Sequence, residues 1–336
     1  GWITGPKKFG GRELPASYDR LYNQLEVQFR VADQSCFTIG LGMVAPTILA
    51  HESPAALDLY VKQMWSAEII GCQLFSEPGA GSDLASLTTK AVKDGDEWII
   101  TGQKVWTSGA HYSDIGEIIC RTDWDLPKHK GLTGFIVDMK APGVEIRPLK
   151  QMTGEAEFDE VFFTDVEMPA EALLGPLHSG WGVGMAVLTS ERGHIGTSVI
   201  SLERRLDSIS RLAEGRDLSS TERQEIVKLL SKGMAYKAMA QRQGPVASTA
   251  ASLMKLGITE MMFETSILRS NISGMDSLLT GPEAFGVLSA PGGRIAGGTS
   301  QVQRNIIGDR VLGLPREPMV DKNMPFKDLK VGTIRS

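Results

Sequence analysis

The segment from Gln73 to Gly109 constrains the fold more than any other part of the sequence. A short apolar run ends at Phe75 and leads into the polar turn Ser76–Asp83, which reads Ser-Glu-Pro-Gly-Ala-Gly-Ser-Asp. Two β-rich runs follow, Thr88–Val92 and Glu97–Thr101, and the Asp-Gly dipeptide between them is a strong signal for a β-hairpin. The segment therefore predicts a strand, a glycine-rich turn and a hairpin in close succession.

The same segment combines groups that suit a flat heterocycle carrying phosphate. Its glycine turn exposes backbone N–H groups and hydroxyls, and the run Lys104–Gly109 adds the planar side chain of Trp106. A Rossmann phosphate turn is the alternative interpretation of the turn alone. That alternative fits less well, because the third glycine is lacking and a hairpin follows instead of a helix.

Hydrophobic periodicity divides the chain into α, β and α regions. Residues 14–70 are predicted to be mainly helical, with a helix start at Ser53-Pro54. Short β-branched and aromatic runs separated by Pro and Gly turns fill residues 72–175, which predicts a sandwich or barrel. Helical periodicity returns at Gly182 and persists to about Gly313, where a glycine-then-proline pattern predicts the stop.

These regions predict an α+β multidomain chain. We expect an N-terminal helical domain over residues 1–71 and a middle antiparallel β-domain, which binds the heterocycle, over residues 72–175. A C-terminal helical bundle is expected over residues 176–315. Residues 316–336 are expected to form a surface tail or an arm onto a neighbouring subunit.

Composition excludes several classes of function. The chain has 336 residues, of which 42% are hydrophobic and 22% charged, as in ordinary globular enzymes. A net charge of −5 gives no reason to expect nucleic acid or an anionic membrane as a partner. The three cysteines and the five histidines lack metal-ligand spacing, so no metal is expected, and the cysteines fit reduced thiols of a cytosolic compartment. With no long apolar run and no signal-peptide pattern, the expected location is cytoplasmic.

The turn and the strand behind it resemble the flavin-binding middle domain of the acyl-CoA dehydrogenase family. The family pattern is Thr/Ser-Glu-Pro-x-Ala-Gly-Ser-Asp, followed by Asn-Gly-x-Lys-x-Trp-x-Thr/Ser. Here the second part is Thr101–Ser108, read as TGQKVWTS, so only the leading Asn differs. The resemblance covers nearly the whole chain and implies the family's α, β, α domain order. It also implies bound FAD, an acyl-CoA substrate, an electron-transfer flavoprotein as electron acceptor, and a homo- or hetero-tetramer.

The resemblance also implies where the chain begins within the family's fold. Its opening phrase, Gly1–Gly11, corresponds to a part inside the family's N-terminal helical domain. The first helices of that domain are therefore expected to be missing.

The resemblance assigns cofactor contacts residue by residue. Ser82 is expected at phosphate or the pantetheine chain of the substrate, Trp106 against the flavin, and Ser108 near its N5. Thr299 begins a predicted helix, so it is either a phosphate-site residue or a plain N-cap. The full set implied to bind FAD is Phe75, Ser76, Ser82, Trp106, Ser108, Thr299 and Gln301.

The catalytic base is expected at Glu191. In most family members a Glu precedes the Gly-Thr-Ser-Gln run, but here Gly297 stands at that position and cannot perform acid–base chemistry. Isovaleryl-type and long-chain members instead carry the base in a Glu-Arg pair on an early C-terminal helix, which matches Glu191 and Arg192. The substrate-binding residues implied are Ser82, Arg192 and Gly297, with Arg192 ordering the site or the subunit packing.

The residues around Glu191 independently favour a functional role. Val187, Leu188 and Ile195 are its helical neighbours, so this carboxylate is predicted to lie on an apolar stripe. A buried carboxylate without a basic partner at helical spacing is costly, and such groups cluster at functional sites. The alternative is a structural glutamate that pairs with an arginine of another helix or points to solvent.

Two departures from the family pattern leave other functions open. The family's Arg-x-x-Phe-Gly run is replaced by Arg211–Leu218, and a glycine-rich loop is replaced by Leu278–Glu283. Both elements normally support a neighbouring subunit's FAD. In lacking them, the chain resembles actinobacterial members, including steroid-side-chain enzymes, in which two different chains assemble. The leading hypothesis is an FAD-dependent acyl-CoA dehydrogenase. A supporting subunit without catalysis and an acyl-CoA oxidase are the alternatives.

Overall fold

The computed structural model describes residues 2–26, 28–51, 53–194, 199–241, 246–316, 318–319 and 321–329, without the side chains of residues 20, 189–194, 199–201 and 246–250. The chain divides into two compact units, each with its own core. Unit 1 comprises Gly1–Gln151, Ala156–Ser190 and Met319–Ser336, and unit 2 comprises Met152–Glu155 and Glu191–Pro318. The fold positions candidate residues within both units.

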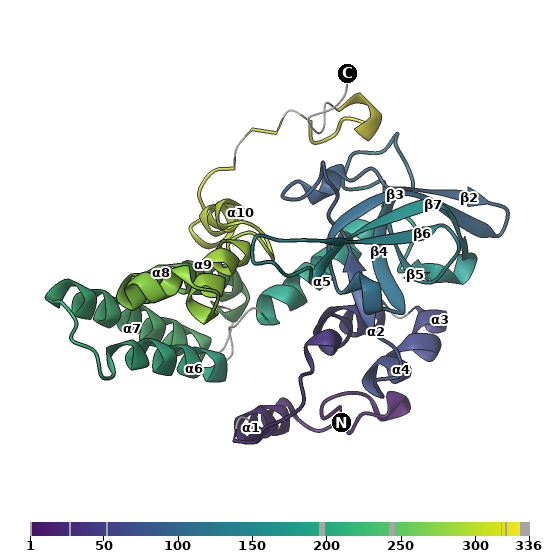
Figure 1. Cartoon of the computed structure of the whole chain (residues 1–336). Helices are drawn as coiled ribbons and strands as arrows, with labels where there is room; N and C mark the ends of the chain where they lie inside the picture. The colour runs from purple at the N-terminus through teal and green to yellow at the C-terminus, as the bar shows by residue number, and fades with distance from the viewer. Residues whose placement is uncertain are drawn as a thin grey trace. The chain divides into compact units, whose positions relative to one another are not determined.

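Unit 1 opens with helical segments that precede the sheet. The principal segments are α1 (Ala16–Glu26), η3 (Gly40–Val44), α2 (Ala45–His51), α3 (Pro54–Ala56), η4 (Leu57–Val61) and α4 (Lys62–Trp65). The helix start expected at Ser53-Pro54 is confirmed, because Pro54 occupies the first position of α3. In Figure 1 these helices lie along one side of the strands of the same unit.

Eight strands in the described part of unit 1 form one sheet in the order β6-β7-β3-β2-β4-β5-β8, with β1 beside β4. Their bounds are β1 (Gly71–Leu74), β2 (Lys90–Asp94), β3 (Glu97–Ser108), β4 (Ile115–Arg121), β5 (Leu132–Asp138), β6 (Val144–Leu149), β7 (Phe158–Pro169) and β8 (Leu173–Leu174). The predicted β-hairpin is confirmed as β2 and β3, whose turn places Gly95 at a left-handed φ of 57°. The sheet is mixed rather than purely antiparallel, since β1 runs parallel to β4.

Alternation along β4 divides the core of unit 1 into two faces. Ile118 and Cys120 join a cluster with residues from β1, β2, β3, β5 and β7, so the sheet wraps around this side. Ile115 and Ile119 point to the opposite face, where the N-terminal helical segments and helix α5 (Gly180–His194) pack. α5 lies so close to the sheet that a Cβ on Gly180 would be 2.5 Å from the Thr133 nitrogen.

Unit 2 is a bundle of long helices. Its elements are α6 (Val199–Ser210), α7 (Ser220–Ala240), α8 (Val246–Ser273), α9 (Pro282–Gly293) and α10 (Ser300–Ile306), the last continued by the π-helical turn η10 (Ile307–Val311). α7 packs between α6 and α8, and α9 packs on α8 (Figure 1). Gly313 follows at a left-handed φ of 66°, which agrees with the stop expected there. Among the described residues, no helix combines the length and the apolar character that crossing a bilayer requires.

The described part of the C-terminal tail returns to unit 1. Phe326 has no exposed surface, and its backbone N–H donates to the Leu126 carbonyl at 2.9 Å. The Lys327 N–H donates to the Trp124 carbonyl, and Pro325 forms an isolated β-bridge with Pro127. The segment Asp321–Leu329 is therefore packed against the chain's own β-domain.

Candidate functional site

The turn after β1 is fixed by backbone hydrogen bonds to itself and to β3. Glu77 and Ala80 exchange N–H···O=C bonds of 3.1 and 3.0 Å, which closes the turn at Pro78-Gly79. The Val105 N–H donates to the Ser76 carbonyl at 2.9 Å and ties the turn to β3 beside Trp106. The two halves of the sequence motif thus meet in space.

A buried ion pair between Lys104 and Glu77 stabilises this turn. The Lys104 ammonium has no exposed surface and donates to Glu77 Oε1 at 2.9 Å and to the Phe75 carbonyl at 3.0 Å. The Glu77 carboxylate also accepts from the backbone N–H groups of Thr88 and Thr89 and from the Thr88 hydroxyl. Burial by itself would raise the pKa of Glu77, but Lys104 and the hydrogen bonds outweigh it and hold the pKa below its usual value. The turn is therefore built around a charged, fully paired glutamate.

Trp106 presents an aromatic surface next to the turn. Its side chain is 59% exposed, its φ is 61°, and the indole meets Phe158 edge-to-face at a ring-centroid distance of 5.9 Å. A non-glycine residue in left-handed backbone is strained, and such strain clusters at ligand sites. The neighbouring Thr107 hydroxyl is buried without a hydrogen-bond partner in the described part of the chain. The exposed indole therefore offers a surface on which an added planar group can pack.

The predicted serines lie in the turn (Ser76 and Ser82) and at the end of β3 (Ser108). Ser76 and Ser108 are half-buried and Ser82 is exposed. Among the described residues, none of these three hydroxyls forms a hydrogen bond. Phe75 differs, because its side chain is 4% exposed and packs in a core cluster with Leu84 and Val187, so only its backbone can reach a ligand.

The second predicted binding segment, in unit 2, is a turn of two glycines before α10. Gly297 and Gly298 have φ values of 64° and 94°, both in the left-handed region. Lys255 on α8 has no exposed surface and donates to the Gly298 carbonyl at 2.6 Å, while the Gln303 amide donates to the Gly297 carbonyl at 3.0 Å. A residue with a Cβ at position 297 would therefore need strained backbone.

Thr299 caps α10 in this structure. Its hydroxyl accepts a hydrogen bond from the Val302 N–H at 3.2 Å, so Thr299 is the N-cap residue of this helix. Gln301 is exposed in the first turn of the helix. Ser300 donates to Glu260 at 2.7 Å, and Glu260 also pairs with Arg294 at 3.1 Å, which anchors the turn to α8.

The predicted base falls on a helix whose side chains are only partly described. Glu191 and Arg192 lie in α5, but their side chains are outside the described part of the structure, as is Ile195 as a whole. Val187, one turn earlier, has no exposed surface, which agrees with the predicted apolar stripe up to that point. The predicted residues therefore divide into a cluster in unit 1 (Phe75, Ser76, Ser82, Trp106, Ser108) and a group in unit 2 (Glu191, Arg192, Gly297, Thr299, Gln301).

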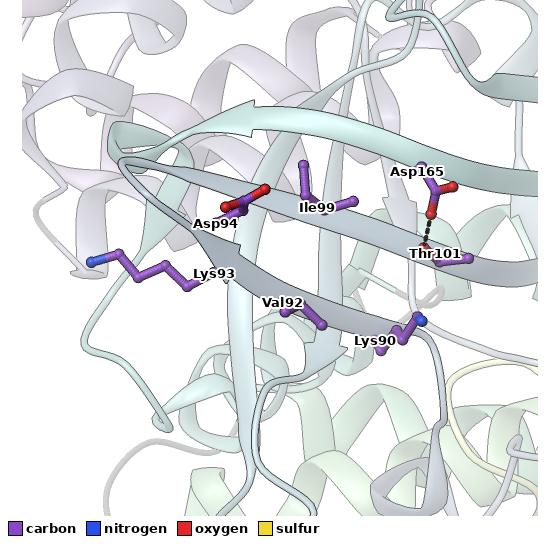
Figure 2. Close-up of a pocket in the computed structure, with 7 residues that line it drawn as sticks. All are labelled: Lys90, Val92, Lys93, Asp94, Ile99, Thr101 and Asp165. Atoms are coloured by element: carbon purple, nitrogen blue, oxygen red, sulfur yellow. Dashed lines mark hydrogen bonds between the residues drawn. The ribbon is translucent and has the colours of Figure 1, made fainter.

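The pocket drawn in Figure 2 lies elsewhere in unit 1. A cavity of about 410 Å³ is lined by residues of β2, β3 and β7, including Val92, Ile99 and Asp165. Figure 2 shows Thr101 and Asp165 joined by a hydrogen bond, which is 2.8 Å long. No predicted site residue lines this cavity, and we assign no function to it.

Sequence reasoning named no role for the two buried lysines. Lys104 and Lys255 each support the backbone of a predicted binding turn, yet each looks in sequence like an ordinary surface cation. For Lys255 the available signal was its sequence neighbours, which are Leu, Met and Ile on a helix. Lys104 follows Gln103 and precedes Val105, so its neighbours gave no such signal. Their partners are 27 and 43 residues away, which local patterns do not reveal.

Comparison with known proteins identifies the family. The domain described as "Acyl-CoA dehydrogenase, middle domain" matches residues 72–166, and "Acyl-CoA dehydrogenase, C-terminal domain" matches residues 178–312. The chain is 37% identical to acyl-CoA dehydrogenase FadE34 of Mycobacterium tuberculosis over 93% of its length, but spans only 44% of that protein. It is 34% identical to acyl-CoA dehydrogenase IpdE1 of the same organism, with 94% of this chain and 84% of IpdE1 covered.

Solved structures agree with this assignment. The ChsE4–ChsE5 complex from Mycobacterium tuberculosis superposes with a TM-score of 0.79 at 26% identity, covering 94% of this chain and 86% of that one. The Tcur3481–Tcur3483 steroid ACAD gives the same TM-score at 25% identity, covering 94% and 85%. With the turn Ser76–Asp83, the mixed sheet and the helical bundle in place, the chain belongs to the acyl-CoA dehydrogenase family.

Proposed function

We propose that this chain carries an FAD-dependent acyl-CoA dehydrogenase activity, which converts an acyl-CoA thioester to the 2-enoyl-CoA. The observation that supports it most is Trp106. This indole is more than half exposed, and its residue has a left-handed φ where the β3–β7 register shifts between Lys104 and Thr107. An exposed aromatic face at a strained backbone position supports a planar partner that would cover it.

The residues of unit 1 fit the isoalloxazine ring of FAD. Trp106 offers the face, and Ser76 and Ser108 offer hydroxyls that have no hydrogen-bond partner in the described part of the chain. Ser82, on the exposed rim of the turn, would meet phosphate or pantetheine. When bound, FAD supplies the acceptor for the hydrogen that leaves Cβ as hydride. Thr299 and Gln301 would contribute from the start of α10.

Glu191 is proposed to take the proton from Cα of the substrate. It follows Val187 by one helical turn, and α5 packs its earlier residues into apolar core. A carboxylate in apolar surroundings is a stronger base than one in water, because loss of hydration favours its neutral form. Gly297 cannot compete for this role, and with Ala296 it would leave space for a bulky acyl group.

The proposed substrate and partners follow from these small residues and from the relatives. We propose a large, branched or ring-bearing acyl-CoA, including the steroid-derived class named for the Tcur3481–Tcur3483 protein. An electron-transfer flavoprotein would receive the electrons. The chain would work within a homo- or hetero-tetramer, as the ChsE4–ChsE5 complex is itself an assembly of two named components.

A panel of CoA thioesters tests this proposal. The flavin-loaded protein is mixed anaerobically with straight-chain, branched and steroid-side-chain thioesters, with and without the chain encoded next to it. Bleaching of the long-wavelength flavin band with 2-enoyl-CoA formation is expected for the bulky members. Hydrogen peroxide formation in air at the rate of turnover would favour an acyl-CoA oxidase instead.

A supporting subunit is the second candidate, and Gly297 favours it. The position where most family members have their base carries no acid–base group in this chain. Such a subunit would bind FAD or a partner's FAD without turnover of its own. A flavin-loaded assembly whose activity is unchanged by Glu191→Gln would establish this candidate and remove the dehydrogenase proposal for this chain.

A further inference from the structure

The Arg121 side chain binds the backbone that follows the turn Ser76–Asp83 in unit 1. This residue ends β4 and is fully buried. Its guanidinium donates to three backbone carbonyls: Leu87 at 3.0 Å, Ala85 at 2.6 Å and Lys128 at 3.2 Å. Leu87 and Ala85 belong to the stretch that directly follows the Ser82-Asp83 end of the turn. One cation thus determines the path of the chain between the turn and β2.

A second cation, Lys128, forms an ion pair with Asp83 at the end of the turn. The Lys128 ammonium, in the loop between β4 and β5, reaches both oxygens of Asp83 at 3.1 and 3.0 Å. Asp83 also accepts from the Ser86 hydroxyl, and these two contacts hold the pKa of Asp83 below its usual value against the effect of its burial. The predicted phosphate-side residue Ser82 is the immediate neighbour of this anchored aspartate.

The C-terminal segment Asp321–Leu329 completes both contacts. The Phe326 ring lies 3.5 Å from the Arg121 guanidinium carbon and has no exposed surface. Asp321 approaches the Lys128 ammonium at 3.7 Å. A buried guanidinium is costly to desolvate, and an aromatic face over it recovers part of that cost. The Trp124 ring lies farther from the same guanidinium carbon, at 5.9 Å.

We propose that segment Asp321–Leu329 is a positioning element for the cofactor turn, acting through Arg121 and Lys128. When Phe326 covers Arg121, residues 83–87 are held in the shape that presents Ser82 to phosphate. When the segment leaves, Arg121 and Lys128 become hydrated, residues 83–87 loosen, and FAD binds more weakly. The last part of this inference rests on the proposed function, whereas the coupling between the segment and the turn does not.

Charge substitution in the full chain tests the coupling. Phe326→Lys places an ammonium against the Arg121 guanidinium and should drive the segment off by like-charge repulsion. Met324→Lys is the matched control, because Met324 lies in the same segment and is 40% exposed. Phe326→Leu keeps an apolar side chain but removes the aromatic face, and should give an intermediate result. Trypsin cleavage at Lys322, a bond that every variant retains, reports release of the segment, and hydrogen exchange of residues 84–90 reports the turn.

For Phe326→Lys we expect faster cleavage, faster exchange at residues 84–90, and an FAD Kd raised about tenfold, equivalent to about 1.4 kcal/mol. Met324→Lys should match the parent chain in all three readouts. Release of the segment with unchanged exchange at residues 84–90, or retention of the segment in Phe326→Lys, overturns the inference. If the parent chain binds no FAD, the proposed function fails, and the exchange measurement still decides whether the segment orders the turn.

Discussion

The two turns predicted to hold the cofactor use the same support but differ in what gives them their shape. Each rests on a fully buried lysine that donates to a turn carbonyl: Lys104 to Phe75 at 3.0 Å in unit 1, and Lys255 to Gly298 at 2.6 Å in unit 2. In the first turn Glu77 neutralises the lysine and gathers hydrogen bonds from β2. In the second, two consecutive left-handed glycines set the path.

This difference teaches where each turn is vulnerable. The first depends on side-chain charge, so removing one partner leaves the other ionised and buried. The second depends on backbone freedom, so its shape tolerates loss of charge better than addition of a Cβ.

The unfolding of the two units can be followed separately, because all six tryptophans lie at or before Trp181, in unit 1. Tryptophan fluorescence therefore reports the unfolding of unit 1, and the helical circular dichroism signal is dominated by unit 2.

Lys104→Met should produce the largest effect. It leaves the Glu77 carboxylate buried without its counter-charge, which costs about 3–5 kcal/mol. Urea unfolding followed by tryptophan fluorescence should show this loss in unit 1, together with loss of bound flavin. Lys93→Met, on the exposed surface of β2, is the control and should stay within about 0.5 kcal/mol of the parent. A loss below about 1 kcal/mol for Lys104→Met would show that the ion pair does not hold the turn.

Lys255→Met should destabilise unit 2 by a smaller amount. The hydrogen bond lost from the Gly298 carbonyl is by itself worth about 1.5–3 kcal/mol, and the two left-handed glycines keep the backbone path of the turn. Circular dichroism during urea unfolding should detect the loss, and fluorescence should remain unchanged. Equal losses for Lys104→Met and Lys255→Met would remove the distinction between the turns.

Glu117 shows what a buried glutamate of unit 1 does without the lysine partner that Glu77 has. This β4 glutamate is fully buried like Glu77, but in the described part of the chain neither of its carboxylate oxygens has a partner. Burial raises its pKa well above the usual value, so the folded chain keeps a proton that the unfolded chain releases above about pH 4.3. Stability should therefore fall as pH rises beyond that point, by up to about 1.4 kcal/mol per pH unit until the folded pKa is reached.

Glu117→Leu should remove this slope and raise the stability of unit 1 at pH 7 by about 1–3 kcal/mol. Fluorescence-detected unfolding between pH 4 and 8 measures both effects. Glu167→Leu, an exposed position on β7, should leave the slope intact. A parent chain whose stability does not decline with pH in this range would mean that Glu117 is paired or hydrated.

Thr299→Ala should give the smallest effect, since it removes one N-cap hydrogen bond worth about 1 kcal/mol. Unfolding of unit 2 by circular dichroism measures the loss, and Thr299→Ser should restore most of it. If Thr299 also contacts FAD, the Kd for FAD should rise in Thr299→Ala beyond what this stability change explains. An unchanged Kd would limit Thr299 to its capping role.

Features set by local sequence were predictable, and features set by distant contacts were not. The Asp94-Gly95 hairpin and the helix start at Pro54 follow from neighbouring residues, and the structure confirms both. The parallel pairing of β1 with β4 joins strands more than forty residues apart, and no local turn sequence indicates it. The pairing of Arg121 with Phe326 lies beyond sequence reasoning for the same reason, because each residue alone is ordinary.

The most direct test of the proposed activity is anaerobic flavin reduction by a productive acyl-CoA in the parent chain and in Glu191→Gln. Glu214→Gln, an exposed glutamate of unit 2, is the matched control and should react like the parent. With equal FAD content, Glu191→Gln should slow reduction by on the order of 10²–10⁴-fold, the usual contribution of a general base. Reduction of Glu191→Gln at the parent rate would contradict the assignment of the base and, with it, the proposed mechanism.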